Sequence, residues 1–466
     1  MAVGLSTPAP LVGRLHTPSA ASRTAAVIGA GWAGLAAAVG LTQAGLSVTV
    51  FEMAPVLGGR ARTVVSARHR GDNGQHILIG AYRASLDLMR QVGVAPEEVL
   101  LRAPLSLQDA HGRGLRLTDG NAALAFARAV LGLRAWPLTE RLALLSRCAA
   151  WAAMGFRCDP ALSVERLCSG LSPALRTELL EPLCVAALNT PAHEASASVF
   201  LRVIRDALIG GPGCADLLLP RVPLGSLLPD AAAHWLESRG AQVIRRARVQ
   251  ALDRRDAGWA VDGRAFDTVV VACTASEAAR LARPHAPDWA SLADGLRHQS
   301  ILTTYVQCDD ARFRHHPMAR LDSGPAQFAF DHGWLSGTPG MFAFVASAAD
   351  SWMTNGLADA EAAVLAQAQA LFRTCGAHGS PRVAHSVCER KATFACTTRL
   401  RRPPARIAHA LWAAADYVAG PYPATLEGAV RNGVAAARAA AEADGDAPRP
   451  SSAFAMQNRV SPSDMD

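Results

Sequence analysis

The stretch TAAVIGAGWAG, residues 24–34, decides the fold. A short apolar run of strand length leads into three glycines spaced as GxGxxG, and an alanine- and leucine-rich stretch of helical composition follows. The first glycine permits a tight turn, the second lets a pyrophosphate approach the backbone, and the third lets the helix pack on the strand. Because the helix N-terminus then faces the phosphates, the stretch predicts a dinucleotide site. Its expected cofactor-binding residues are Gly29, Gly31, Trp32, Ala33 and Gly34.

The next strand pattern supports this interpretation. It covers Ser47–Phe51 and ends at Glu52, eighteen residues after Gly34. A carboxylate at this position accepts hydrogen bonds from ribose hydroxyls and disfavours a 2′-phosphate. No charged residue occurs from Thr24 to Phe51, a length that could span a bilayer. A buried parallel strand with its crossover helix explains the same pattern.

The length and the charge of the chain limit the classes of protein to which it can belong. A chain of 466 residues is long enough for two or more domains. Its formal charge of +7 comes almost entirely from arginine, because Lys391 is the only lysine. The arginines are scattered and form no basic stripe interleaved with aromatic residues, so we expect no nucleic-acid partner. Weak attraction to an anionic membrane surface is compatible with this charge.

The spacing of the cysteines and the composition of the N-terminal residues indicate the cellular compartment. The ten cysteines show no CxxC spacing, so we expect no metal site. Most lie in apolar surroundings, which predicts buried, reduced thiols and a cytoplasmic protein. The first 23 residues are rich in Ser, Thr, Pro and Ala and lack the apolar core of a secretory signal. We interpret residues 1–23 as a flexible extension.

A second glycine motif, Leu57-Gly58-Gly59-Arg60-Ala61-Arg62, distinguishes FAD from NAD. Here the sequence resembles the large family of flavin-containing amine oxidases and carotenoid desaturases, whose GG-x-R motif carries further backbone and arginine to the FAD pyrophosphate. A glycine pair with arginines suits a diphosphate that needs backbone donors and cationic neutralisation. The resemblance implies FAD as cofactor, bound by Gly58, Gly59, Arg60 and Arg62. Two surface arginines beside a loop are the alternative.

Further strand patterns of the same domain occur at 240–244, 248–252, 259–261 and 266–273. In the family that the sequence resembles, the residue equivalent to Val249 contacts the adenine of FAD. The continuous apolar run at 268–271 is typical of a buried parallel strand.

The C-terminal part of the chain resembles the family's closing FAD motif. The resemblance implies that Asp416 contacts the ribityl chain, and that Thr425 and Leu426 lie at the pyrimidine edge of the flavin. A helix that begins near Leu426 suits the negative charge of a reduced flavin. The family commonly has Gly before the acid, where this chain has Ala415, and the departure weakens the assignment of Asp416.

The predicted fold class is α/β, with a discontinuous Rossmann-like FAD-binding domain and an inserted α+β substrate domain. The FAD-binding domain is expected at 24–95, 220–275 and 405–440. The substrate domain comprises 96–219, which is helical by composition, and 276–404, which carries strand patterns. Residues 441–466 are interpreted as a disordered tail.

A narrower resemblance starts at DNGQHILIGAY, residues 72–82. With 187–191, 390–394 and 416–433, this stretch resembles the hydroxysqualene dehydroxylases of hopanoid biosynthesis. The resemblance implies that reduced FAD supplies a hydride from N5 to an allylic carbon of hydroxysqualene, and the product is squalene. An oxidising relative, such as a carotenoid-type desaturase or an amine oxidase, remains an alternative. A non-catalytic flavin-binding subunit of a terpenoid-forming complex is another.

The same stretch supplies the candidates for acid chemistry, His76 and Asp72. His76 titrates near neutrality and could protonate the leaving oxygen, while Asp72 could orient or donate. The alternative is a structural cradle in which Gly74 and Gln75 pass the flavin by their backbone. Some flavin amine oxidases place a lysine at N5 through water, but we expect Lys391 to be an exposed partner of Glu389.

A triterpene substrate predicts a long apolar tunnel and access from a membrane face, on the inner side of the cytoplasmic membrane. We expect the tunnel in the helical insertion, near Trp136, Trp151 and Phe156, although an apolar helix face also suits a core. Residues 189–191 either line this channel or form a helix-ending turn. Only one dinucleotide motif is evident, so a separate electron donor is expected to reach the flavin.

Overall fold

The computed structural model describes residues 23–65 and 70–442. The expected N-terminal extension and C-terminal tail therefore lie outside the described residues, apart from Arg23 and the end of the last helix. In these described ranges no helix combines the length and the apolarity needed to cross a bilayer. The charge-free stretch 24–51 forms a strand, a helix and a second strand instead.

A six-stranded sheet forms the centre of the cofactor domain. Its strands, in spatial order, are β10 (Gln242–Arg245), β2 (Ser47–Glu52), β1 (Thr24–Ile28), β14 (Thr268–Val271), β21 (Leu411–Ala413) and β20 (Arg406–Ala408). The first five are parallel, and β20 pairs with β21 antiparallel. Three separate parts of the chain supply these strands, so the predicted α/β, discontinuous Rossmann-like fold is confirmed.

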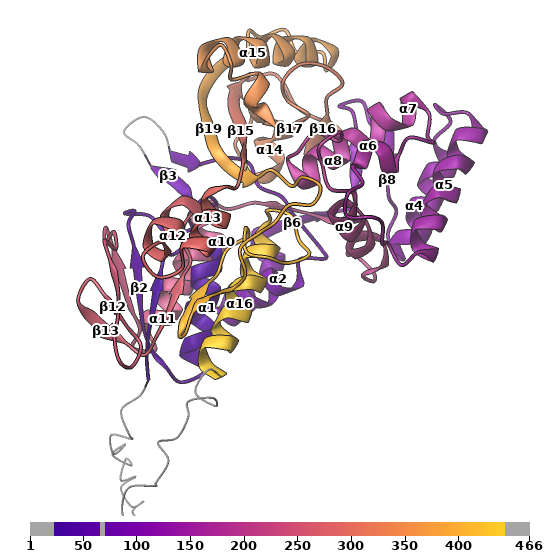
Figure 1. Ribbon diagram of the computed structural model, residues 1–466. Helices are drawn as coiled ribbons and strands as arrows, with labels where there is room; N and C mark the ends of the chain where they lie inside the picture. Colours follow the sequence, from indigo (N-terminus) through magenta and orange to yellow (C-terminus); the bar gives the residue numbers. More distant parts are fainter. Residues whose placement is uncertain (1–22, 66–69, 443–466) are drawn as a thin grey trace, which may run out of the picture.

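Two helices from opposite ends of the sequence pack together beside this sheet (Figure 1). They are α1 (Trp32–Gln43) and α16 (Leu426–Glu442). Glycines allow the close approach: a Cβ on Gly40 would lie 2.8 Å from Ala437 Cβ, and one on Gly433 would lie 2.2 Å from the Ala33 carbonyl oxygen. Arg23 also donates to the Ala440 and Ala441 carbonyls at 3.3 and 2.9 Å, which satisfies the C-terminal end of α16.

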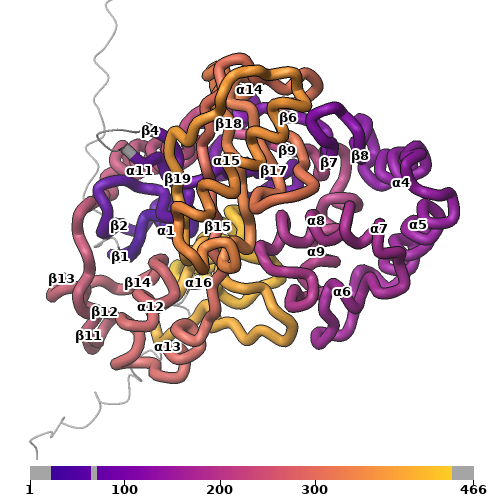
Figure 2. The backbone as a smooth tube through the Cα atoms, turned by 90° about the horizontal axis from the view of Figure 1, so that it is seen from above, coloured from indigo at the N-terminus to yellow at the C-terminus, as the bar shows by residue number. Residues whose placement is uncertain are grey.

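The second part of the molecule is a five-stranded antiparallel sheet (Figure 2). Its order is β16 (Met318–Arg320), β17 (Phe328–Asp331), β18 (Met341–Ser347), β15 (His298–Gln307) and β19 (Arg382–Phe394). Helix α15 (Leu357–Thr374) packs on this sheet through a phenylalanine-rich core that includes Phe342, Phe344 and Phe372. Strands β15 and β18 lie within 276–404, where the sequence predicted strands.

The third part is a helical lobe, and its helices match the leucine- and alanine-rich runs of the sequence. It contains α4 (Ala122–Gly132), α5 (Leu138–Ala153), α6 (Val164–Leu167), α7 (Pro173–Leu175), the π-helix η1 (Arg176–Leu180), α8 (Glu181–Leu188) and α9 (Ala197–Ile209). Asn121 begins α4, because its side-chain oxygen accepts from the N–H groups of Ala123 and Leu124, both at 3.1 Å. Short strands precede the lobe, which composition did not predict: β6 (Leu100–Ala103), β7 (Ser106–Gln108) and β8 (Gly114–Arg116).

The remaining elements connect these parts. They are β3 (Thr63–Val65), β4 (Arg70–Asp72), β5 (Leu78–Ile79), α2 (Arg83–Gln91), α3 (Pro96–Val99), β9 (Leu217–Pro220), α10 (Leu224–Leu227), α11 (Pro229–Glu237), β11 (Leu252–Arg254), β12 (Trp259–Val261), β13 (Arg264–Phe266), α12 (Ala275–Ala282), α13 (Pro287–Asp294), α14 (His332–Leu335) and the 3₁₀ turn η2 (Ala349–Ser351).

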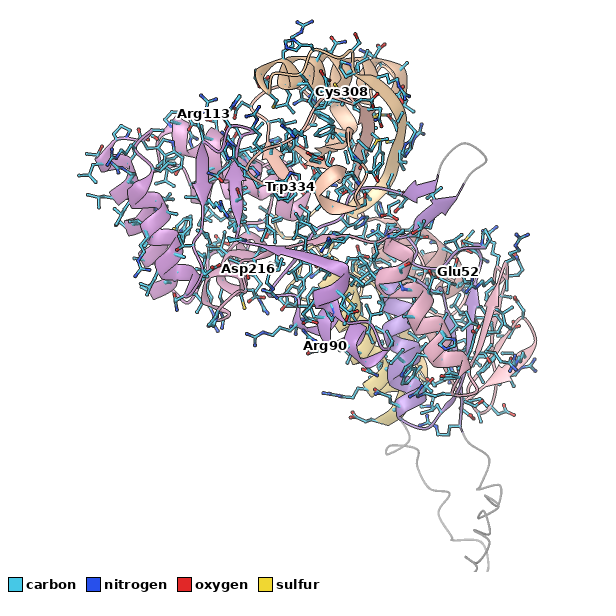
Figure 3. All side chains as sticks on the ribbon, turned by 180° about the vertical axis from the view of Figure 1, so that it is seen from behind. Glu52, Arg90, Arg113, Asp216, Cys308 and Trp334 are labelled. Carbon is cyan, nitrogen blue, oxygen red and sulfur yellow. The ribbon has the colours of Figure 1, made fainter. Side chains whose placement is uncertain are left out.

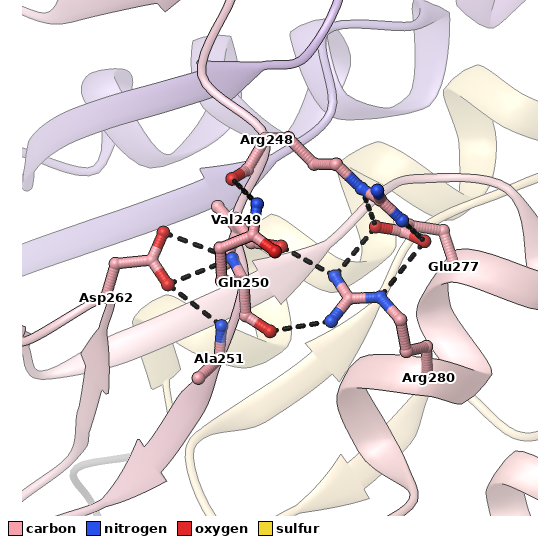
Figure 4. Close-up of polar contacts among 7 residues, drawn as sticks. All are labelled: Arg248, Val249, Gln250, Ala251, Asp262, Glu277 and Arg280. Carbon is pink, nitrogen blue, oxygen red and sulfur yellow. Dashed lines mark hydrogen bonds and ion pairs between the residues drawn. The ribbon is translucent and has the colours of Figure 1, made fainter.

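The strand expected at 248–252 is wrong for most of its length, and Figure 4 shows why. Arg280 donates to the carbonyls of Val249 and Gln250, both at 2.6 Å. Asp262 accepts from the N–H groups of Gln250 and Ala251 at 2.9 and 2.8 Å. Side chains thus take the hydrogen bonds that a neighbouring strand would have supplied, and regular pairing begins only at β11.

We expect Gly433→Val to push α16 away from α1 and to destabilise the fold by about 1–3 kcal/mol, because the added atoms meet the backbone of Ala33. Thermal unfolding should show a lower melting temperature than that of the wild type. The matched control is Gly132→Ala at the end of α4, where an added Cβ meets no atom within 4 Å. An unchanged melting temperature in Gly433→Val would contradict the packing described.

Candidate active site

One cavity of about 830 Å³ lies where the three parts of the molecule meet. The glycine motifs and the start of α16 line one end, and apolar side chains of the helical lobe and the antiparallel sheet line the other. Of the predicted cofactor-binding residues, fifteen lie on its wall: Gly29, Gly31, Trp32, Ala33, Glu52, Gly58, Gly59, Arg60, Arg62, Gly74, Gln75, Val249, Asp416, Thr425 and Leu426. Gly34 is buried behind them, because its missing Cβ makes room for the Gly29 carbonyl oxygen.

The two glycine loops leave backbone open to the cavity. Gly29 has a φ of 104°, and a Cβ there would lie 2.6 Å from the Ala272 carbonyl oxygen, so the turn requires glycine. Around Gly31 the nearest atom to an added Cβ is Gly59 Cα at 3.8 Å. A side chain at Gly31 would therefore fill the space between the loops, which is the space that a diphosphate needs.

Glu52 braces the first loop from the end of β2 (Figure 3). One carboxylate oxygen accepts from the Ala30 N–H at 2.7 Å and the other accepts from the Ala54 N–H at 2.8 Å. The side chain is buried, yet it also lines the cavity. Each oxygen keeps a further lone pair, so the same carboxylate can accept hydrogen bonds from ribose hydroxyls.

Arg60 connects three distant segments. Its guanidinium forms an ion pair with Asp416 and donates to the Ala392 carbonyl at 2.8 Å. Burial lowers the pKa of Arg60, but the charge of Asp416 and its hydrogen bond raise that pKa further, so the net shift is upward. Arg62 lies beside it and donates to the Gly59 carbonyl. Two fixed cations thus face the end of the cavity that the glycine loops form.

Two further observations fit a flavin dinucleotide. The side-chain amide nitrogen of Asn73 is buried at the cavity wall and donates to no atom among the described residues, so it suits an acceptor on a bound molecule. The N-termini of α1 and α16 both open on the cavity, where helix dipoles favour negative charge. Phosphates and a reduced flavin carry that charge.

His76 lines the cavity but is tied to its own loop. Its Nδ1 lies 3.0 Å from the Gly74 carbonyl, so this nitrogen carries the proton and donates. Burial lowers the pKa of His76, and the charge of Arg60 adds to that effect. The imidazole is therefore neutral near pH 7, and its Nε2 is an acceptor. This arrangement works against the predicted role of His76 as proton donor.

Asp72 is not among the residues that line the cavity. Its carboxylate accepts from the Thr63 hydroxyl at 3.0 Å and from the Leu224 N–H at 2.9 Å, which fixes β3 and β4 to the start of α10. Burial raises the pKa of Asp72, and these hydrogen bonds partly offset the shift. The structure favours the structural alternative for this residue over a catalytic role.

Lys391 is exposed, as expected, and it also lines the cavity. It lies on β19 and lines the cavity with Glu389 and Arg390. In the part of the chain that the structure describes, Lys391 takes part in no ion pair, so the expected pair with Glu389 is absent. The charge of Glu389 acts on Arg60 instead and helps to raise the pKa of Arg60.

Apolar side chains line the other end of the cavity, and we call this end the apolar wing. Trp151 lines it as expected, whereas Trp136 and Phe156 do not. Trp136 instead donates to Glu178 at 2.8 Å in the core of the lobe. The larger apolar side chains of the wing are Phe126, Leu144, Trp151, Leu179, Leu183, Val203, Ile204, Met318, Phe328 and Phe330.

Asn189 meets both expectations for its segment. It ends α8 in the left-handed conformation, with a φ of 46°, and it also lines the cavity. Its amide donates to Thr393 Oγ1 at 2.9 Å, and its oxygen accepts from the Ala348 N–H at 2.6 Å. Asn189 therefore fixes the helical lobe to the antiparallel sheet beside the cavity.

Some residues of the wall carried no signal in the sequence. Tyr422 lines the cavity, donates to Asp206 at 3.1 Å and accepts from Arg202 at 2.7 Å. Asn73 stood inside the quoted DNGQHILIG stretch but was not singled out. The Tyr422 cluster joins α9 to the segment before α16, and no local pattern predicts a contact between residues 216 positions apart.

Comparisons with known proteins agree with this geometry. A family model described as flavin containing amine oxidoreductase matches residues 32–441. Hydroxysqualene dehydroxylase of Rhodopseudomonas palustris is 31% identical over 430 residues, which cover 89% of this chain and 98% of that protein. The protein of the same name from Sinorhizobium fredii is 28% identical over 426 residues, with coverage of 88% and 96%.

Solved structures show the same fold. An oxidoreductase from Methanosarcina mazei superposes with a TM-score of 0.67 at 17% identity, covering 89% of this chain and 99% of that one. Cyclohexylamine oxidase from Brevibacterium oxydans gives a TM-score of 0.64 at 17% identity, with coverage of 90% and 99%. The prediction of FAD as cofactor and the resemblance to hydroxysqualene dehydroxylases are confirmed. The chain therefore belongs to the flavin containing amine oxidoreductase family, within its hydroxysqualene dehydroxylase group, and is an FAD-dependent oxidoreductase.

Proposed function

We propose that this protein removes the hydroxyl of hydroxysqualene reductively and releases squalene, as a step of hopanoid biosynthesis. One observation carries the proposal: a single cavity joins the cofactor loops to a wing of aliphatic and aromatic side chains. An isoprenoid chain fits such a wing, because apolar surface removed from water gains about 25 cal/mol per Å². The relatives named hydroxysqualene dehydroxylase, which match along almost their whole length, support the same reading.

The reaction balances with one hydride and one proton. When it is bound and reduced, FAD supplies the hydride to the allylic carbon. The C–O bond breaks, the proton joins the departing hydroxyl, and water and squalene are the products. The chain contributes the apolar walls of the wing, among them Trp151, Phe328 and Phe330, which exclude bulk water from the reacting carbon.

We assign the proton to Lys391 and a positioning role to His76. Lys391 is an ammonium group on the cavity wall with no carboxylate bound to it among the described residues, so its protons are available. His76 presents Nε2 as an acceptor, since its Nδ1 proton is donated to Gly74. That lone pair suits the hydroxyl of the substrate or an intervening water.

The FAD contacts are proposed from the same wall. We assign the diphosphate to the loops of Gly31 and Gly59 with Arg62, the ribose to Glu52, and the adenine to Val249. The remaining assignments are the ribityl chain to Asp416 and the flavin to Gly74, Gln75, Thr425 and Leu426. We further propose that a separate donor reduces the flavin, and that the substrate arrives from the cytoplasmic membrane.

The central prediction is anaerobic turnover. Protein loaded with FAD and reduced by dithionite should convert hydroxysqualene into squalene, detected by mass spectrometry, with one equivalent of flavin oxidised per product. The control is the oxidised protein, which should give no squalene. If squalene does not form, and the oxidised protein instead oxidises an amine or a polyene, an oxidising relative is the correct interpretation. If FAD binds but no substrate reacts, the protein is a non-catalytic flavin subunit.

Glu52→Gln should weaken FAD binding by about tenfold or more, because an amide cannot accept from both Ala30 and Ala54. Titration of the apoprotein with FAD, followed by flavin fluorescence, measures the dissociation constant. Glu237→Gln on the exposed side of α11 is the matched control and should bind FAD like the wild type. An unchanged dissociation constant in Glu52→Gln would show that this carboxylate does not shape the site.

Lys391→Met should keep FAD and lower kcat by about a hundredfold, since general acids typically contribute factors of 10² to 10⁴.

The pKa of His76 is lowered, so this imidazole is already neutral at pH 7 and gains a proton only on acidification below its usual range. Between pH 7 and 8, turnover should therefore depend on pH in the same way in the wild type and in His76→Ala. Asp72→Asn keeps both hydrogen-bond acceptor contacts and should retain turnover. A rise in turnover on acidification that disappears in His76→Ala would identify His76 as the acid instead.

A further inference from the structure

Exposed apolar side chains gather on one part of the molecule. Among the described residues, twelve large apolar side chains are exposed, and half of them lie in the helical lobe. These six are Leu124, Leu131, Leu138, Leu142, Met154 and Ile209. Five belong to α4, α5 or the residue that ends α5, and we call Leu124, Leu131, Leu138, Leu142 and Met154 the outer α4–α5 face. A concentration of this kind marks an interaction surface more often than scattered exposed leucines do.

Helix α5 has the reverse of the usual amphipathic pattern. Its exposed positions carry only Leu, Thr, Ala and Ser, and its three charged residues, Glu140, Arg141 and Arg147, are half-buried. A helix that faces water normally places charge outward. Helix α2 of the cofactor domain does so: its exposed positions are Arg83, Asp87 and Arg90.

The charged groups of α5 are held away from the outer face. Arg141 donates to the Leu131 carbonyl at the end of α4, and its Nε is buried with no acceptor among the described residues. One carboxylate oxygen of Glu140 is likewise buried without a partner in the described chain. Burial of polar atoms without partners costs free energy, whereas outward side chains would be hydrated. The fold therefore accepts a cost that keeps the α5 part of the outer face free of charge.

Exposed arginines lie on α4 and in the segments that flank α5, and we call Arg128, Arg134 and Arg157 the basic rim of this face. Residues 122–157 contain five arginines and one glutamate. Arg128, Arg134 and Arg157 are exposed and take part in none of the ion pairs found in the described ranges. Exposed arginines around an apolar centre complement a surface with an apolar interior and anionic head groups, with each basic residue near such a surface worth about 1 kcal/mol.

The same helices also form the wall of the cavity. Phe126 of α4 and Leu144 and Trp151 of α5 line the apolar wing, while the outer face lies on the opposite side of these helices. In both views the pair α4 and α5 forms the outermost layer at one end of the molecule, away from the cofactor sheet (Figures 1 and 2). A flat surface could therefore contact the outer face without obstruction by the other two parts.

We propose that the outer α4–α5 face docks on a lipid bilayer that contains anionic lipids, and that the apolar wing receives its substrate from this side. The substrate part rests on the proposed function, whereas the docking part does not. Leucines and Met154 enter the acyl boundary, and the arginines of the rim contact phosphate groups. No helix needs to cross the bilayer for this attachment.

Vesicle binding of the full-length, FAD-loaded protein tests the docking. The wild type should sediment with vesicles of phosphatidylcholine and phosphatidylglycerol, and should bind less to phosphatidylcholine alone or at high salt. The double variant Leu138→Glu/Leu142→Glu should partition onto anionic vesicles at least about tenfold less well, because two apolar side chains are lost from the contact. Leu124→Glu on α4 is the second variant and should weaken binding in the same direction.

The matched control is Leu357→Glu, an apolar residue 39% exposed at the start of α15, which should bind like the wild type. FAD absorbance and thermal unfolding show whether each variant is folded. Squalene formation from detergent-dissolved hydroxysqualene should persist in the double variant, while formation from vesicle-embedded substrate should fall. If the wild type forms no squalene from detergent-dissolved hydroxysqualene, the proposed reaction is refuted. Vesicle binding then still tests the docking separately.

Two results would overturn the docking proposal. The first is equal vesicle binding by the wild type, the double variant and Leu124→Glu. The second is a wild-type protein that ignores vesicles but forms a dimer in mass photometry, with the dimer lost in the double variant. That outcome would show that the outer α4–α5 face is an interface between two copies of the chain.

Discussion

The ion pair between Arg60 and Asp416, with the further bond from Arg60 to the Ala392 carbonyl, is the constraint on which the cavity depends. It joins the second glycine loop to the end of β19 and to the segment after β21, which lie 332 and 356 positions further along the chain. Because Arg60 is held charged by Asp416, the cofactor domain and the antiparallel sheet meet at a fixed cation. Asn189 has the same function for the helical lobe, through its bonds to Thr393 and Ala348. The three parts of the molecule therefore enclose one space.

That space combines two environments that an oxidoreductase for an apolar alcohol needs. Near the glycine loops, helix N-termini and arginines supply fixed positive charge, which suits a diphosphate and a reduced flavin. In the wing, side chains such as Trp151 and Phe328 supply apolar surface and exclude water. The polar side chains between the two ends are few, and this scarcity limits which groups can handle a proton. Lys391 is one of these groups, because it lines the cavity while being exposed, as the sequence predicted.

The fold was predictable where the sequence signal was local. The GxGxxG turn follows from a glycine pattern, the strand at 268–271 from a continuous apolar run, and the helices within 96–219, such as α5, from composition, and each is present. The site was predictable only in outline, because side chains from distant segments decide it. Val249 was expected on a strand, but Arg280 donates to its carbonyl and Asp262 accepts from the N–H of Gln250. Asp72 was a plausible acid by type, yet Thr63 and Leu224 engage its carboxylate outside the cavity. No pattern near residue 72 announces a contact with residue 224.

The hydrogen bond from Arg23 to Ala441 connects residues 418 positions apart, and it has a consequence for biosynthesis. Strand β1 precedes the other strands of the cofactor domain in the sequence, while β21 and α16, which complete it, follow hundreds of residues later. A ribosome adds residues from the N-terminus, and contacts of such long sequence separation cannot form until both partners have emerged. The first glycine loop is therefore synthesised long before α16, its partner across the cavity and on α1. The face of α1 that packs on α16 is covered only after the C-terminal segments have been made.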